Sequence, residues 1–171
     1  DFCSKLKFDV AIGLDIARKY TWKKGETTDR NYLSKLKTFS ESKWNLAVNK
    51  LFLEEVPDKS IVDYFAAVHG NSPVDYLSYL NLVLTIENEL RRKYGGFAVG
   101  GLGNATKDNI YNTVRLLRNR LQQLGDDRPI HVLGVGSVQN IIPLSLIGAD
   151  TFDCHSPWRR ASEDKLIIPP V

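Results

Sequence analysis

The sequence predicts an α/β fold with a parallel sheet of the (β/α) TIM-barrel type, built as a single partial domain over residues 1–171. One unit recurs along the chain: a short apolar run, a turn and then a helical pattern, an alternation typical of parallel βαβ units. The apolar runs are nearly continuous, as expected for strands buried on both faces of a sheet. A full eight-stranded barrel needs about 250 residues, so we expect five units of an incomplete barrel. A doubly wound sheet is the alternative.

The first three units are predicted from apolar runs and helical spacing. Residues 8–14 are the first expected strand, and residues 32–52 follow with leucines at helical spacing. Residues 64–68 form the second strand, and Pro73 suits the first turn of a helix that we expect over residues 76–93. Residues 96–99 are the third strand.

The last two units carry clearer boundary signals. Residues 107–124 show the strongest amphipathic pattern, and Gly125 is expected to end that helix. Residues 129–133 are the fourth strand. Ser137 can cap a helix over residues 138–147, which Gly148 ends. Residues 149–152 form a short fifth strand.

Composition excludes several classes of protein. Hydrophobic residues make up 43% of the chain and charged residues 25%, close to the average of soluble domains, so a disordered chain is not expected. No apolar run approaches the roughly 20 residues of a membrane span. The two cysteines form neither a zinc motif nor a disulfide framework, which indicates a reducing, cytoplasmic setting. The net charge of +3 is compatible with a nucleic-acid partner without indicating one.

Chemically capable residues follow every predicted strand. In both parallel architectures ligands bind at the carboxyl ends of strands, so these residues are expected to meet at one rim. They are Asp15, His69-Gly70-Asn71, Gly100-Gly101-Leu102-Gly103, Gly134-Val135-Gly136-Ser137 and Asp153. Their convergence on one edge carries more weight than any one of them.

Each rim feature has a structural alternative. Asp15 can read the edge of a guanine base, or it is a helix cap or solvated acid. His69 can bond a ligand carbonyl, or it packs within the protein. The backbone N–H groups of Gly100–Gly103 can hold a ligand oxygen, or this segment is a simple turn. Gly134–Ser137 can bind a phosphate at a helix start, or it is a tight turn.

Asp153 has the widest chemical scope. A carboxylate at the rim can attack an anomeric carbon and form a covalent sugar intermediate. Arg159 and Arg160 can then contact phosphates, while Trp158 can stack on a base or pack on the barrel. The alternative is an Asp–Arg ion pair that closes the last loop. Three further arginines, Arg115, Arg118 and Arg120, are expected to face solvent.

Three segments in this order and spacing resemble the tRNA-guanine transglycosylase superfamily. They are Phe97-Ala98-Val99-Gly100-Gly101-Leu102, Leu133-Gly134-Val135-Gly136 and Gly148-Ala149-Asp150-Thr151-Phe152-Asp153-Cys154. The resemblance is strongest from Gly95 to Arg160. It implies that the chain is the C-terminal five βα units of a TIM barrel. It also implies exchange of guanine in nucleic acid for a 7-deazaguanine, without a redox cofactor.

The resemblance also implies roles for individual residues. Asp153 matches the nucleophile, and Asp15 matches the carboxylate that reads the guanine edge. The backbone of Gly101 and Leu102 matches the base-recognition loop. His69, next to Gly70, stands where the family commonly has Gln, and Arg159 matches an Arg near the nucleophile.

Departures from the family pattern leave the substrate open. Ser162 stands where tRNA enzymes usually carry a second Arg, and this pattern, with the Trp158 loop, favours the branch that modifies DNA. The family's structural zinc motif would lie beyond Val171, and its first strands, with an acid/base Asp, would precede Asp1. The partners expected are therefore DNA or tRNA, a 7-deazaguanine base and another chain or segment that completes the barrel. The alternatives are a non-catalytic partner subunit and an unrelated phosphate-binding barrel enzyme.

Overall fold

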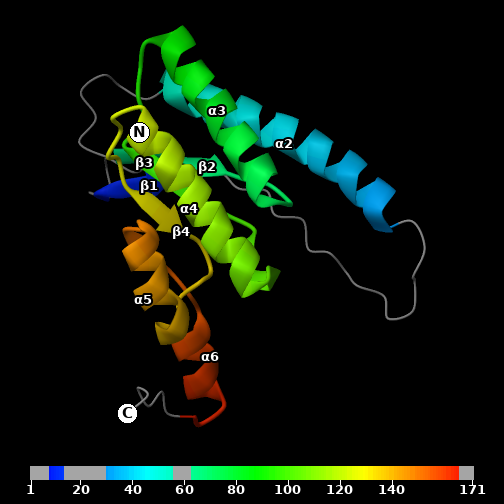
Figure 1. Cartoon of the computed structure of the whole chain (residues 1–171), viewed down its shortest axis with the longest axis vertical. Coiled ribbons are helices and arrows are strands. Elements are labelled where there is room, and N and C mark those ends of the chain that lie inside the picture. Colours follow the sequence, from blue (N-terminus) through cyan, green and yellow to red (C-terminus); the bar gives the residue numbers. More distant parts are fainter. Residues whose placement is uncertain (1–7, 14–29, 56–62, 166–171) are drawn as a thin grey trace.

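A computed structural model of the chain describes residues 8–13, 30–55 and 63–165. Strands and helices alternate in it as the sequence predicts (Figure 1). The strands are β1 (Val10–Ile12), β2 (Asp63–Val68), β3 (Gly96–Val99), β4 (Ile130–Val132) and β5 (Thr151–Phe152). The helices are α2 (Arg30–Glu55), α3 (Pro73–Leu90), α4 (Lys107–Gln123), α5 (Val138–Ile147), α6 (Ser156–Ser162) and the 3₁₀ turn η1 (Leu102–Asn104).

The five strands form one parallel sheet in the order β1-β2-β3-β4-β5. Each new strand is added at the same edge, so the chain winds in one direction around the sheet. A doubly wound sheet reverses its strand order at a switch point, and the described strands show no such reversal. The architecture is therefore part of a (β/α) barrel, and the predicted fold class is confirmed.

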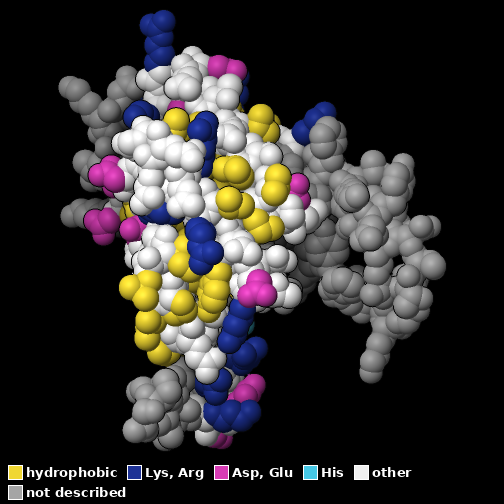
Figure 2. All heavy atoms as spheres, viewed as in Figure 1, with side chains coloured by type: hydrophobic (Ala, Val, Ile, Leu, Met, Phe, Trp, Pro, Cys, Tyr) yellow, Lys and Arg dark blue, Asp and Glu magenta, His cyan; other side chains and the backbone are white. Residues whose placement is uncertain are grey.

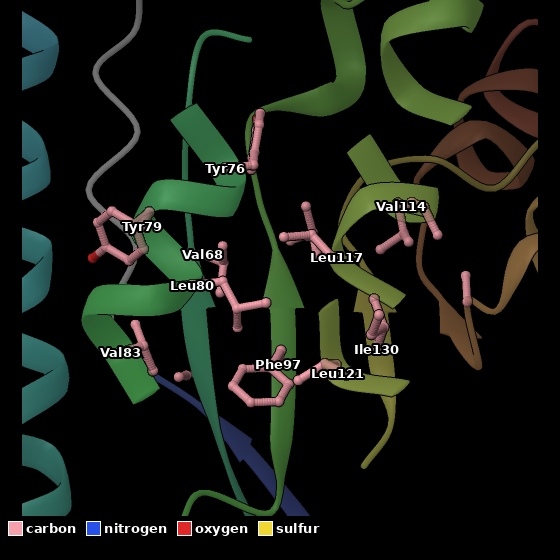
Figure 3. Packing of buried hydrophobic residues seen from close by; sticks show 14 of the residues in the cluster. Val68, Tyr76, Tyr79, Leu80, Val83, Phe97, Val114, Leu117, Leu121 and Ile130 are labelled. Carbon is pink, nitrogen blue, oxygen red and sulfur yellow. The ribbon is translucent and has the colours of Figure 1, made fainter. Parts of the chain in front are cut away.

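The core lies between the sheet and its helices. Alternate strand residues point toward the helices, namely Ala66, Val68, Phe97, Val99, Ile130 and Val132. They pack against buried positions of α3 and α4, among them Leu80, Val83, Val114, Leu117 and Leu121 (Figure 3). Because strand side chains alternate between faces, the residues between them, Ala67, Ala98 and His131, point to the opposite face of the sheet. In a barrel that face is the interior.

The boundaries of the helices follow local capping. The Ser72 hydroxyl accepts a hydrogen bond from the Asp75 N–H, so α3 begins at Pro73, earlier than residue 76 as predicted. Thr106 caps α4 in the same way. Gly125 and Gly148 have positive φ after α4 and α5, which confirms both predicted helix ends. Ser137 occupies the N-cap position of α5, as predicted, but its side chain makes no capping hydrogen bond.

The prediction that Arg118 faces solvent is also wrong. Only 8% of Arg118 is exposed, and its guanidinium donates to the Gly148 and Arg128 carbonyls and to the Asp150 carboxylate at 2.6 Å. The same carboxylate accepts the Ile130 N–H at 2.7 Å. Arg118 therefore ties α4 to the segment that leads into β5. Arg115 is exposed, as predicted, whereas Arg120 is partly buried and bonds Asn81.

A buried ionic cluster lies at the amino end of β3 and β4. Arg128 forms ion pairs with Glu87 and Asp126, and its guanidinium stacks 4.6 Å from the centre of the Phe97 ring. Burial alone would lower the pKa of Arg128, but the hydrogen bonds to Glu87 and Asp126 outweigh it and raise that pKa. The Arg128 side chain also holds the pKa of Asp126 below its usual value. This cluster fastens the sheet at the edge opposite the rim.

The described helices include none that combines the length and the apolarity needed to cross a membrane. This agrees with the absence of a long apolar run in the sequence.

Candidate active site

The predicted rim residues follow successive strands at the carboxyl edge of the sheet. Because the strands are parallel and consecutive in space, the segments that follow β2, β3, β4 and β5 are neighbours. A Cβ atom added to Gly103 would lie 4.0 Å from the Gly134 carbonyl oxygen, so the β3 and β4 loops almost touch. Asp15 lies outside the described residues, and its predicted role stays a prediction.

Asp153 follows β5 and contacts the glycine loop that follows β4. Its Oδ1 atom accepts the Gly134 N–H at 2.9 Å and lies 3.3 Å from Nε2 of His131. The Asp153 side chain is still 57% exposed, so it is held in place and remains open to a ligand. These contacts replace the Asp–Arg ion pair that was the structural alternative.

Gly136 and Cys154 fix the spacing between the two loops. A Cβ atom at Gly136 would lie 2.3 Å from the sulfur of Cys154 and 2.7 Å from its Cβ atom. Only glycine fits such a close approach. The Gly-Val-Gly segment and the Asp-Cys pair therefore pack directly against each other at the rim.

Replacing Gly136 by Ala should destabilise the fold by about 1–3 kcal/mol, since one of the two loops must move to admit a methyl group. The matched control is Gly103→Ala, whose added methyl meets no atom closer than 4.0 Å. Thermal unfolding of both variants checks the prediction. Equal midpoints for the two would show that the β4 and β5 loops are not packed as described.

The glycine loop after β3 can contact a ligand through its backbone groups rather than through side chains. Leu102 is 1% exposed, so its side chain belongs to the core and only its main chain can reach a ligand. The Tyr76 hydroxyl, from α3, donates to the Gly100 carbonyl at 2.6 Å and fixes the loop. This arrangement suits the predicted recognition of a base by Gly101 and Leu102, which stays a prediction.

His69 and Gly70 lie directly after β2. The His69 ring packs edge to face on Tyr79 of α3, with 5.8 Å between ring centres. Gly70 packs on the first turn of α3, where an added Cβ atom would lie 2.6 Å from the Tyr76 nitrogen. Both residues have clear packing roles at the rim, and their part in base binding stays a prediction.

Helix α6 carries the residues predicted to contact nucleic acid. Trp158 is 80% exposed, which excludes the alternative that it packs on the described part of the barrel. Arg159 and Arg160 are also exposed. Figure 2 shows Lys and Arg side chains gathered in the lower part of the view, where α6 lies in Figure 1. An exposed indole beside two guanidinium groups suits a polyanion with exposed bases.

The alternative of a phosphate site at Gly134–Ser137 is weakened by the hydrogen bonds of this loop. The Gly134 N–H is taken by the Asp153 carboxylate, and a second anion beside it would be repelled. The N–H groups of Asn140 and Ile141 bond the Ser137 carbonyl. At Gly134 the turn therefore favours the Asp153 carboxylate over a phosphate.

Two residues of the site were missed by the sequence analysis. Tyr76 gave no signal, because its role depends on a contact between α3 and the β3 loop. His131 did give one: it alternates with Ile130 and Val132, so a polar side chain faces the barrel interior near a strand end. Nowhere in the described segments do three or more metal-ligating side chains cluster. The zinc motif that the resemblance places beyond Val171 stays a prediction.

Comparison with known proteins finds a matching family and similar proteins. A family model described as queuine tRNA-ribosyltransferase matches residues 1–169. Proteins named queuine tRNA-ribosyltransferase are 37% identical over 103 residues in Protochlamydia amoebophila, 37% over 73 in Desulfosudis oleivorans and 31% over 97 in Helicobacter pylori. These alignments cover 60%, 43% and 57% of the chain. They span only 24%, 18% and 24% of those relatives, so the aligned part of the chain corresponds to about a quarter of their length or less.

Proposed function

Because the chain belongs to the queuine tRNA-ribosyltransferase family, we propose that it carries the nucleophile of a base-exchange reaction in nucleic acid. The single observation that carries the proposal is the position of Asp153. Its carboxylate is anchored through one oxygen at the barrel rim and is otherwise exposed. A carboxylate held in this way suits attack on an anomeric carbon.

The reaction has two displacements. Asp153 attacks C1′ of a guanosine ribose, the C1′–N9 bond breaks, and guanine leaves with the electron pair and takes up a proton. A 7-deazaguanine then attacks C1′ through its own ring nitrogen, loses a proton and releases the carboxylate. Each bond to C1′ that breaks is replaced by a new bond to C1′, so the free energy of the glycosidic bond is conserved and no nucleotide cofactor is required.

The neighbouring rim supplies positioning. The backbone of Gly101 and Leu102, fixed by Tyr76, is proposed to hold the base edge, together with His69 and Asp15. Trp158, Arg159 and Arg160 are proposed to bind the polynucleotide beside the reacting nucleotide. Backbone and phosphate contacts of this kind position a substrate, and base contacts specify it.

Further strand–helix units are proposed to complete the barrel. This proposal is supported by apolar side chains left exposed at both edges of the described sheet. Val10 and Ile12 of β1 are 45% and 37% exposed, while Val138, Ile142 and Leu146 on one face of α5 are 41%, 60% and 85% exposed. In a closed barrel the adjoining units cover such positions.

Incorporation of labelled guanine into tRNA and into DNA, assayed side by side with the chain in the presence of the units that complete its barrel, tests the function. The relatives are named for tRNA, so tRNA is the first substrate, and DNA, favoured by the arginine pattern, is the second. We expect incorporation into one of them, and competition by a 7-deazaguanine. Absence of incorporation into both would contradict the proposed function.

A further inference from the structure

His131 is the one histidine of the described segments that both faces the barrel interior and lies within hydrogen-bond distance of Asp153. It lies in the middle of β4, between Ile130 and Val132, which are fully buried against the helices. Its own side chain therefore points to the opposite face and is 13% exposed there. A polar ring at such a position requires partners, and the structure provides one on each nitrogen.

The two ring nitrogens of His131 bond residues on either side of Phe152. Nδ1 lies 2.8 Å from the Thr151 hydroxyl, and Nε2 lies 3.3 Å from Oδ1 of Asp153. The Gly134 N–H reaches the same Oδ1 at 2.9 Å. Two donors therefore converge on one carboxylate oxygen. The other oxygen, Oδ2, accepts no hydrogen bond from any described residue.

These partners determine which nitrogen carries the proton. An ionised carboxylate can only accept hydrogen bonds, so Nε2 of a neutral His131 must be protonated to bond Asp153. Nδ1 is then an acceptor, and the Thr151 hydroxyl donates to it. Thr151 thus selects the tautomer that His131 needs in order to hold the carboxylate.

We propose that His131 is a positioning residue for Asp153, which anchors Oδ1 so that Oδ2 is the attacking atom. This inference rests on the proposed function. A lone pair of Oδ2 forms the bond to C1′ while the C1′–N9 bond breaks and its electrons leave with guanine. Oδ1 becomes the carbonyl oxygen of the resulting ester and keeps its bonds to Gly134 and His131. The incoming base then displaces Oδ2, and both donors stabilise the departing carboxylate.

The tautomer of His131 can be measured without any activity. In the ¹⁵N-labelled chain, long-range ¹⁵N–¹H correlation at mildly alkaline pH distinguishes a protonated from an unprotonated ring nitrogen. The chain has three histidines, and loss of one set of signals in His131→Gln assigns this residue. We expect a protonated Nε2 and a bare Nδ1, and a weaker preference in Thr151→Val. A protonated Nδ1 in the wild-type chain would overturn the arrangement.

Kinetics of two His131 variants test the role in the reaction. His131→Leu removes the donor, and His131→Gln keeps an amide N–H at a similar reach. Loss of one hydrogen bond to a charged group should lower kcat by about tenfold to a hundredfold. KM for the base should change little, because the role inferred for His131 is to bond the Asp153 carboxylate and not the base. His131→Gln should recover most of the rate.

The outcomes separate this inference from the proposed function. Exchange in the wild-type chain with an equal loss in both His131 variants, or with none in His131→Leu, overturns the positioning role and leaves the function standing. Absence of exchange in the wild-type chain overturns the function and with it the role of His131 in attack. The tautomer measurement still decides whether His131 holds Asp153. Unfolding midpoints of both variants show whether a lost rate reflects a lost fold.

Discussion

Asp153→Asn should reduce base exchange by on the order of 10⁴-fold or more, the loss expected when a covalent nucleophile is removed. The amide oxygen of Asn can still accept the Gly134 N–H, which lies 2.9 Å from the carboxylate. The fold should therefore survive, and only the nucleophile should be lost. Incorporation of labelled guanine measures the rate. Denaturing electrophoresis of the chain with its nucleic acid reveals the covalent adduct, which should disappear with the activity.

Asp127→Asn is the matched control for this variant. Asp127 is exposed and lies at the amino end of β4, away from the rim. It should exchange bases at the wild-type rate and form the adduct. Undiminished exchange by Asp153→Asn would refute the assignment of the nucleophile and would favour a non-catalytic role for this carboxylate.

Arg128→Met should lower the free energy of unfolding by about 3–5 kcal/mol, the cost of leaving a buried carboxylate without its partner. Glu87 is 5% exposed and Asp126 has a side-chain exposure of 12%, so water cannot replace the guanidinium. Arg128 also donates to the Tyr94 carbonyl at 2.8 Å. Urea unfolding measures the change. Arg115→Met, at an exposed position of α4, should change the free energy by no more than about 0.5 kcal/mol.

The double variant Arg128→Met, Glu87→Gln tests the physical reason for that loss. A neutral amide needs no counter-charge, so it should recover part of the lost stability even though the ion pair is absent. Glu87 also accepts the Tyr94 N–H at 2.8 Å, and Gln can keep that bond. If the double variant were less stable than Arg128→Met, the cost would come from lost packing on Phe97 rather than from an unpaired charge.

The fold could be predicted from the sequence because its elements are signalled locally. The helix over Val138–Ile147 has the predicted bounds, and the strand and the glycine before and after it lie where turn chemistry requires them. The sequence alone did not decide between the barrel and the doubly wound sheet, because the order of the strands depends on the direction in which each crossover connection turns. The error at Arg118 has a similar origin: a basic residue on an amphipathic helix reads as solvated, and its acceptors lie 10 to 32 residues further along the chain.

The candidate site was predictable to the level of segments. Parallel strands place every strand end on one edge, so Asp153 and the glycine loops could be grouped without a structure. The structural alternative for Asp153 was an ion pair with an arginine, whereas the structure provides His131 and Gly134 as its partners. Register decides this, because His131 pairs with Thr151 and so stands two residues before the nucleophile on the neighbouring strand. Registers between strands cannot be read from composition or periodicity.

The Arg128 cluster has a consequence for how this protein can vary. It binds the sheet at the amino end, and it shares no side chain with the loops around Asp153. Changes in free energy add when positions are distant and share no partners. Rim residues such as Trp158 can therefore be substituted without reducing the stabilisation that Arg128, Glu87 and Asp126 provide. The residues that stabilise the fold and the residues proposed to contact substrate lie at opposite ends of the strands. The second set can therefore change toward a different substrate while the first is kept.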